Sequence, residues 1–171
     1  AYSTLSHVGF ILLGLVAGSA AGVQASLFYT IIYVIMATGA FGSVILLSGR
    51  GVEADRLDDF KGLGQRNPWF AGMLVLLMVS MIGVPPLAGF YAKWWVLSAL
   101  VDSGQIGLAV AAVVFSVIGA FYYLRVIHLM LFDESKSGAR VEMPLDIRVV
   151  LTINALLLLI IGLLPERLLE L

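Results

Sequence analysis

A lysine follows two adjacent prolines in the segment Gly83-Val84-Pro85-Pro86-Leu87-Ala88-Gly89-Phe90-Tyr91-Ala92-Lys93-Trp94-Trp95, inside a nearly charge-free region, 68–101. Proline donates no backbone N–H, so this pair interrupts a helix and leaves carbonyl groups of the preceding turn unpaired. Irregular backbone is tolerated at membrane depth where protein buries it or a water-filled cavity hydrates it. The segment therefore predicts a discontinuous transmembrane helix, with the break formed by Gly83, Pro85, Pro86 and Gly89.

Lys93 is the residue of this region that is charged at neutral pH. A lysine at the centre of a membrane helix costs about 2.5 to 3.5 kcal/mol, so it usually lines an ion path or faces a partner. The alternative is that its stem snorkels to the headgroups. About 13 Å of helix separates Lys93 from Asp102, roughly twice the reach of a lysine stem. We therefore expect Lys93 to be buried and to carry a proton.

The composition defines the class of protein. Of its 171 residues, 61% are hydrophobic and 12% are charged, which is typical of a polytopic helical membrane protein and excludes a soluble globular domain. A formal net charge of -1 gives no reason to expect nucleic acid as a partner. The absence of cysteine excludes disulfides and thiolate metal sites, and the two distant histidines predict no metal centre. Because no initiator methionine precedes Ala1, we expect a fragment of a longer chain.

Apolar regions long enough to cross about 30 Å of hydrocarbon occur at 1–23, 25–47, 68–101, 106–132 and 147–164. The third would form a straight helix of about 51 Å, so it is either one broken or tilted span or a hairpin of two short ones. The loops 48–67 and 133–146 are rich in lysine and arginine, whereas 102–105 has neither.

The positive-inside rule places both basic loops in the cytoplasm, which requires the third region to cross the membrane once. The sequence therefore predicts an all-α fold with five transmembrane helices, in one membrane domain over 1–171, and a periplasmic C-terminus. The basic residues behind this orientation are Arg50, Arg56, Lys61, Arg66, Lys136, Arg140 and Arg148.

His7 is a second ionisable residue within an apolar region. Imidazole accepts a proton on one nitrogen and releases one from the other near neutral pH, so His7 is a candidate relay. A histidine that only holds two helices together by hydrogen bonds is the alternative, and the sequence leaves both open. Further candidates for the path or its support are Tyr2, Ser3, Ser6, Tyr33 and Tyr91.

The fourth apolar region ends near the expected cytoplasmic boundary with Tyr122, Tyr123 and Arg125. Aromatic residues are enriched at membrane interfaces, and an arginine side chain reaches the headgroups from there. We interpret these three residues as cytoplasmic-side anchors. A role in proton entry is the alternative.

Four blocks of sequence, in this order, resemble the antiporter-like, proton-pumping membrane subunits of respiratory complex I, the bacterial NADH-quinone oxidoreductase. They are AYSTLSHVG at 1–9, DDFKGL at 58–63, IGVPPLAGFYAK at 82–93 and IGAFYYLR at 118–125. The resemblance covers nearly the whole chain. Lysine at position 93 resembles the N and L types of subunit rather than the M type, which carries glutamate there.

The resemblance implies the C-terminal part of a subunit built from inverted repeats, in the bacterial inner membrane. It assigns Lys93 to the proton-exit side and His7 to a central hydrophilic axis. The implied function is a translocase that couples quinone reduction to proton pumping, without redox chemistry in this chain. NADH, flavin, iron–sulfur clusters and quinone would belong to other subunits. The implied partners are subunits K and M, the lateral helix of subunit L, and membrane lipid.

Two other functions remain open at this point. The first is a subunit of a multisubunit cation/proton antiporter, which has the same fold and a similar lysine but no redox coupling. Sodium dependence would distinguish it. The second is a structural membrane module without transport, in which Lys93 is paired and inert.

Overall fold

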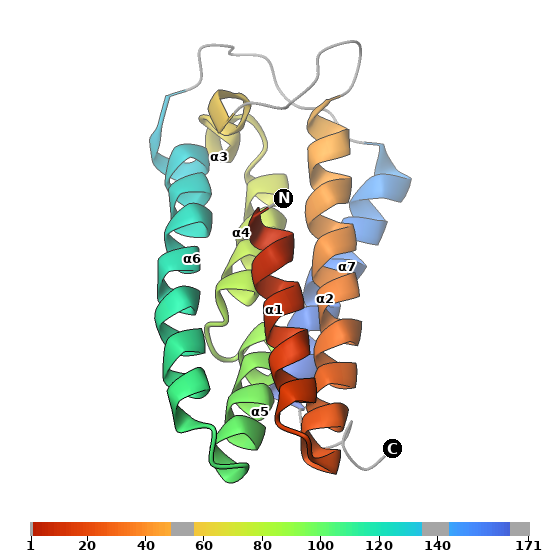
Figure 1. Ribbon diagram of the computed structural model, residues 1–171. Coiled ribbons are helices and arrows are strands. Elements are labelled where there is room, and N and C mark those ends of the chain that lie inside the picture. The colour runs from red at the N-terminus through yellow and green to blue at the C-terminus, as the bar shows by residue number, and fades with distance from the viewer. Residues whose placement is uncertain (1, 49–56, 135–143, 165–171) are drawn as a thin grey trace.

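The computed structural model describes residues 2–48, 57–134 and 144–164, and the regular elements in these ranges are helices (Figure 1). Several basic residues of the predicted loops, Arg50, Arg56, Lys136 and Arg140, lie outside the described residues, as does the C-terminal segment 165–171. The elements are α1 Tyr2–Val16, α2 Ala20–Leu47, the 3-10 helix η1 Leu57–Phe60, α3 Leu63–Arg66, α4 Pro68–Ile82, α5 Ala88–Asp102, α6 Ile106–Phe132 and α7 Leu145–Leu163.

Helix length separates these elements into two groups. Within the described residues, α2, α6 and α7 are long and apolar enough to cross a membrane. The helices α1, α4 and α5 have 15 residues each. Each is therefore about 22 Å long, short of a hydrocarbon core of about 30 Å.

The turn between α1 and α2 comes earlier than the apolar pattern predicts. The first predicted region runs to residue 23, but α1 ends at Val16 and α2 begins at Ala20. Gly18 has a φ of 65°, and the Ser19 hydroxyl accepts the Gly22 N–H at 3.1 Å, which caps α2. Apolar residues continue on both sides of this turn, so hydropathy alone does not locate it, whereas N-cap chemistry does.

The residues predicted to break a helix lie between α4 and α5 or next to that junction. Gly83 ends α4 with a φ of 88°, a conformation that L side chains rarely adopt. A Cβ at Gly89 would overlap the Ser80 carbonyl oxygen, so only glycine lets the start of α5 lie against the end of α4. In Figure 1, α4 occupies the upper half of the bundle and α5 the lower half.

The two ends of the bundle are each held together by contacts between distant segments. At one end, the Gly62 N–H donates to the Leu129 carbonyl at 3.1 Å, and the Arg148 guanidinium lies 4.9 Å from the centre of the Trp69 ring. At the other end, the Gln105 side chain donates to the Val16 carbonyl at 2.8 Å. The described residues that flank both basic loops therefore share one end (Figure 1).

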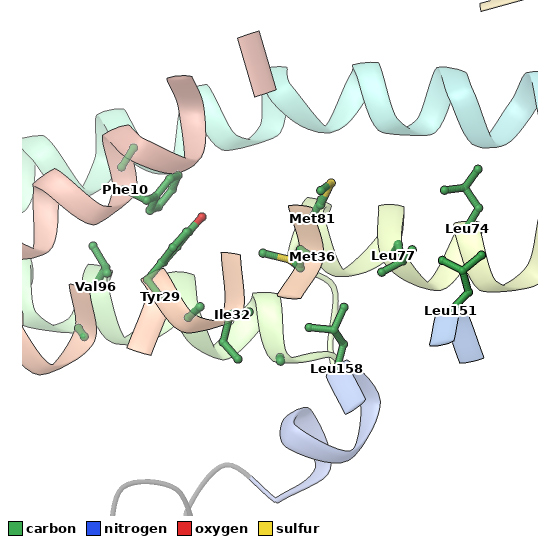
Figure 2. Packing of buried hydrophobic residues seen from close by; sticks show 14 of the residues in the cluster. Phe10, Tyr29, Ile32, Met36, Leu74, Leu77, Met81, Val96, Leu151 and Leu158 are labelled. Carbon is green, nitrogen blue, oxygen red and sulfur yellow. The ribbon is translucent and has the colours of Figure 1, made fainter. Parts of the chain in front are cut away.

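The apolar core lies between α2, α4, α5 and α7, with α1 along one side. Figure 2 shows Met36 of α2 among core residues of α4 and α7, and Phe10 of α1 next to Tyr29 of α2. In contrast, most of α6 is exposed, with buried residues only at Ala109, Ala112 and Met130 among those described. The outer face of α6 is apolar, as expected for a helix that contacts lipid or other membrane helices.

Candidate functional site

Lys93 of α5 extends back towards the junction with α4. Its ammonium donates to the Ile82 carbonyl at 2.8 Å and to the Ser116 hydroxyl of α6 at 2.7 Å. The ring of Phe10 lies 5.4 Å from the same nitrogen. Among the described residues, no carboxylate forms an ion pair with Lys93. Neutral dipoles and an aromatic face therefore hold this ammonium group.

The sequence explains why the Ile82 carbonyl is available. In a continuous α-helix, the carbonyl of residue 82 would accept the N–H of residue 86. Residue 86 is Pro86, which has no N–H. The carbonyl at the end of α4 therefore lacks its helical donor, and the Lys93 ammonium supplies one. The proline pair and the lysine are thus two parts of one site.

An open-sided pocket of about 280 Å³ lies beside Lys93. Its polar side chains are Lys93 and Ser116, and its other lining residues are Phe10, Ile82, Gly83, Phe90, Trp94, Leu97, Val113, Val117 and Ala120. A water molecule takes about 30 Å³ of liquid volume, so the pocket has room for several. Water in this pocket could exchange protons with Lys93.

His7 of α1 lies in a second polar cluster and is only 2% exposed. Its Nδ1 lies 2.9 Å from the Tyr29 hydroxyl of α2, and its Nε2 lies 3.1 Å from the Tyr123 hydroxyl of α6. The Tyr123 hydroxyl also forms a hydrogen bond with Ser3. The Tyr33 ring stacks on His7, with centroids 5.0 Å apart. These contacts form a hydrogen-bonded chain from Ser3 through Tyr123 and His7 to Tyr29.

Both nitrogens of His7 have partners that can donate or accept, because a tyrosine hydroxyl does either. In neutral imidazole one nitrogen donates and the other accepts, so reversing the tautomer needs only rotation of the hydroxyls. The cluster can therefore hold or pass a proton without large movement. The same bonds also hold α1, α2 and α6 together, so the relay and the structural alternatives both fit this geometry.

Phe10 contacts both clusters. Its side chain is 4% exposed and stacks on the Tyr29 ring, with centroids 5.7 Å apart and planes at 10°. Its other contact is the Lys93 ammonium described above. An apolar ring therefore lies between the lysine and the hydroxyl that binds His7.

The other predicted residues have different surroundings. Tyr2, Ser3 and Ser6 line an open pocket of about 440 Å³ between α1 and α6, together with Phe115, Gly119, Tyr122 and Tyr123. Tyr91 packs on Phe90 and Trp95, at 5.3 and 6.4 Å between centroids. Tyr122 and Arg125 are exposed on α6. The roles of these residues in a proton path or as membrane anchors stay predictions.

Ser116 is a contact that sequence reasoning does not select, and Tyr29 is one of the scattered hydroxyls of 25–47 to which it gives a structural role before a role in the path. Ser116 precedes Tyr123 by two helical turns, so both side chains lie on one face of α6. This spacing is the sequence pattern from which Ser116 could have been identified as a candidate. Tyr29 precedes Tyr33 by one turn on α2, which places two tyrosines on one face as well.

A family model described as NADH:quinone oxidoreductase/Mrp antiporter, transmembrane, matches residues 1–119. NADH-quinone oxidoreductase subunit N of Thioalkalivibrio sulfidiphilus is 54% identical over 171 residues, which is 100% of this chain and 36% of that protein. The subunit N of Thiobacillus denitrificans is 52% identical over 168 residues. The chain thus spans little more than a third of the length of these relatives.

A chain of respiratory complex I from Thermus thermophilus is 31% identical, with a TM-score of 0.82, and the match covers 96% of this chain and 37% of that one. A chain of the Mrp complex from Dietzia shares the fold, with a TM-score of 0.88 at 23% identity and coverage of 99% and 40%. The predicted resemblance to antiporter-like subunits is confirmed, and the apolar helices place the chain in a bacterial membrane. This chain belongs to the NADH:quinone oxidoreductase/Mrp antiporter transmembrane family.

Proposed function

We propose that this chain is part of the proton-translocating region of a bacterial NADH-quinone oxidoreductase, in the subunit that its relatives name N, and that Lys93 carries the proton. The observation that carries this proposal is the ligand set of the Lys93 ammonium. It consists of the Ile82 carbonyl freed by Pro86 and the Ser116 hydroxyl, without a carboxylate among the described residues. A charge that is held by neutral dipoles responds readily to other charges nearby, because no fixed counter-ion holds it in place.

We further propose that α4 and α5 together form one discontinuous span, which makes five spans with α1, α2, α6 and α7. The helices α4 and α5 lie one above the other in the bundle, so together they extend along the length that α2 and α6 each cover alone (Figure 1). The described residues that flank the two basic loops lie at the same end of the bundle, which supports the same topology. If α4 and α5 formed a hairpin of two separate spans, the two loops would lie on opposite faces of the membrane. The loops 48–67 and 133–146 are then cytoplasmic and the C-terminus periplasmic.

Proton transfer in this scheme uses water in the pocket and the hydroxyl chain around His7. Loss of the proton leaves Lys93 as a neutral amine, and a charge change elsewhere in the subunit alters how tightly it holds the next proton. Moving one charge against 100 mV costs about 2.3 kcal/mol. A change of one unit in the pKa of a group corresponds to about 1.36 kcal/mol, so a change of fewer than two units supplies this free energy. Modest electrostatic changes at one lysine are therefore sufficient to drive release.

In this proposal the chain carries no redox chemistry, and NADH, flavin, iron–sulfur clusters and quinone are handled by other subunits. Its partners are then the neighbouring membrane subunits K and M and the lateral helix of subunit L, with membrane lipid on exposed faces such as α6. The similarity to a chain of respiratory complex I from Thermus thermophilus supports a place among such membrane subunits.

The test is quinone-dependent proton pumping in vesicles that carry the intact complex with Lys93→Ala in the full-length subunit. Proton transfer by a positioned side chain contributes about hundredfold or more, so we expect coupled turnover to fall by at least about that factor. Lys93→Met, which keeps the length of the side chain, should have the same effect. Lys61→Ala removes a lysine that pairs with Asp58 at the basic end and is the control with normal pumping.

A second candidate is a subunit of a multisubunit cation/proton antiporter. The Dietzia Mrp chain has the same fold, and the family model covers both groups. Transport that depends on sodium and persists without quinone turnover would favour it. Normal turnover and normal proton yield in an assembled Lys93→Ala complex would instead leave only the structural module.

A further inference from the structure

This inference rests on the proposed function and concerns what Lys93 needs in order to release a proton. As an ammonium, Lys93 has three N–H donors and requires acceptors. As a neutral amine, it also has a lone pair, which requires a donor. The Ile82 carbonyl accepts but never donates, and the Phe10 ring does not donate either. Among the described side chains that contact the Lys93 nitrogen, the Ser116 hydroxyl is the one that does both.

The hydroxyl of Ser116 is used differently from four other helical hydroxyls in this chain. Thr30, Thr38, Ser43 and Thr152 each donate to the carbonyl four residues earlier in their own helix. Ser116 makes no such bond within the described part of α6. It accepts from Lys93 instead, at 2.7 Å. Its hydroxyl hydrogen is therefore not committed to the backbone and can rotate.

We infer that Ser116 is a positioning residue that keeps the Lys93 nitrogen hydrogen-bonded in both its charged and its neutral form. In the charged form, Ser116 accepts from the ammonium. When the proton leaves to water in the pocket, the Ser116 hydroxyl rotates and donates its hydrogen to the amine. Ser116 keeps its own proton throughout, so the net change is one proton moved from Lys93 to water.

Ser116 therefore affects the equilibrium between the ammonium and the amine forms of Lys93. A hydrogen bond to a charged group is stronger than one to a neutral group, so loss of Ser116 disfavours the ammonium more than the amine. Among the described residues, the titratable side chain of a neighbouring helix that lies near enough to respond to the charge of Lys93 is His7 of α1. The α4 and α6 contacts to the Lys93 nitrogen are the uncharged Ile82 carbonyl and Ser116.

The experiment compares Ser116→Val with Ser116→Thr in the intact complex with the full-length subunit. Valine and threonine have nearly the same shape, but only threonine keeps a hydroxyl. The readout is the pH profile of quinone-dependent proton pumping. We expect the alkaline limb of Ser116→Val to move by about one pH unit towards lower pH, and that of Ser116→Thr to stay near the wild type. Ser116→Ala should behave like Ser116→Val.

Thr38→Val is the matched control, because it removes an exposed hydroxyl that bonds only within α2. Equal profiles for Ser116→Val and Ser116→Thr, whether normal or impaired, would overturn the inference, since the hydroxyl would then be irrelevant. The Lys93→Ala complex distinguishes failure of the role of Ser116 from failure of the proposed function. If Lys93→Ala stops pumping while Ser116→Val is normal, the inference alone fails. If Lys93→Ala pumps normally, the proposed function fails, and the role of Ser116 with it.

Discussion

The clusters around His7 and Lys93 adjoin the same residue, Phe10, but are built from different groups. His7 is enclosed by side-chain hydroxyls from α2 and α6, one on each ring nitrogen. Lys93 is held by a backbone carbonyl at a helix break together with one side-chain hydroxyl, that of Ser116, and opens on a pocket. The histidine cluster therefore depends on the side chains that surround it, whereas the lysine cluster depends also on the path of the backbone. A substitution that disturbs the backbone at the helix break should therefore affect the Lys93 cluster first. A substitution that removes a hydroxyl next to His7 should affect the His7 cluster first.

The largest effect is expected at Gly89, which supports only the lysine cluster. In Gly89→Ala, the added Cβ overlaps the Ser80 carbonyl oxygen, so α4 and α5 must move apart. Overpacking of this kind costs about 3 kcal/mol. We expect weaker assembly of the complex and a lower thermal midpoint, followed by loss of pumping in what assembles.

Gly72→Ala is the control for this prediction. Gly72 lies in the apolar helix α4, but a Cβ there would meet nothing within 4 Å. Alanine is a better helix former than glycine by about 1 kcal/mol, so this variant should assemble normally or better. Similar behaviour of the two variants in thermal melts would show that the close approach at the break does not hold the lysine site.

Tyr123→Phe tests the histidine cluster without moving the backbone. It removes the hydroxyl that joins His7 to Ser3 and leaves one imidazole nitrogen without its partner. An unsatisfied polar group costs about 1 to 3 kcal/mol, so coupled turnover should fall by about tenfold if the chain carries protons. Tyr122→Phe, one residue earlier and exposed, should have no effect. Unchanged proton yield with Tyr123→Phe would leave His7 with a purely structural role.

Sequence reasoning reached the lysine cluster because local patterns encode most of it. A proline pair, nearby glycines and one charge in an apolar region are all visible in the residues 83–93. The link between Pro86 and the Ile82 carbonyl follows from helix geometry alone. What no local pattern contains is the residue on another helix that completes the site, and Ser116 was therefore not predicted.

The histidine cluster was less accessible to sequence reasoning. Tyr123 is predicted as an interfacial anchor, since a tyrosine near the end of an apolar region has that role most often. Its hydroxyl binds His7 because α1 and α6 pack together, a fact of tertiary structure rather than of local sequence. The early end of α1 has a different origin, because the Ser19 cap that starts α2 is a local feature of the sequence that hydropathy does not register.

The smallest effect is expected at Phe10, which contacts both clusters. Phe10→Leu keeps an apolar side chain at the position but removes the aromatic face from the Lys93 ammonium. A cation–π contact contributes about 0.5 kcal/mol or more, so we expect coupled turnover to change by about twofold. The measurement is the proton yield per quinone reduced, together with passive proton leak in vesicles without substrate. If the ring also blocks water between Lys93 and the His7 hydroxyls, the leak should rise, because leucine fills less of that space. If coupled turnover changes but passive proton leak does not, Phe10 acts on Lys93 alone. Other residues besides this ring must then keep water from connecting the two clusters.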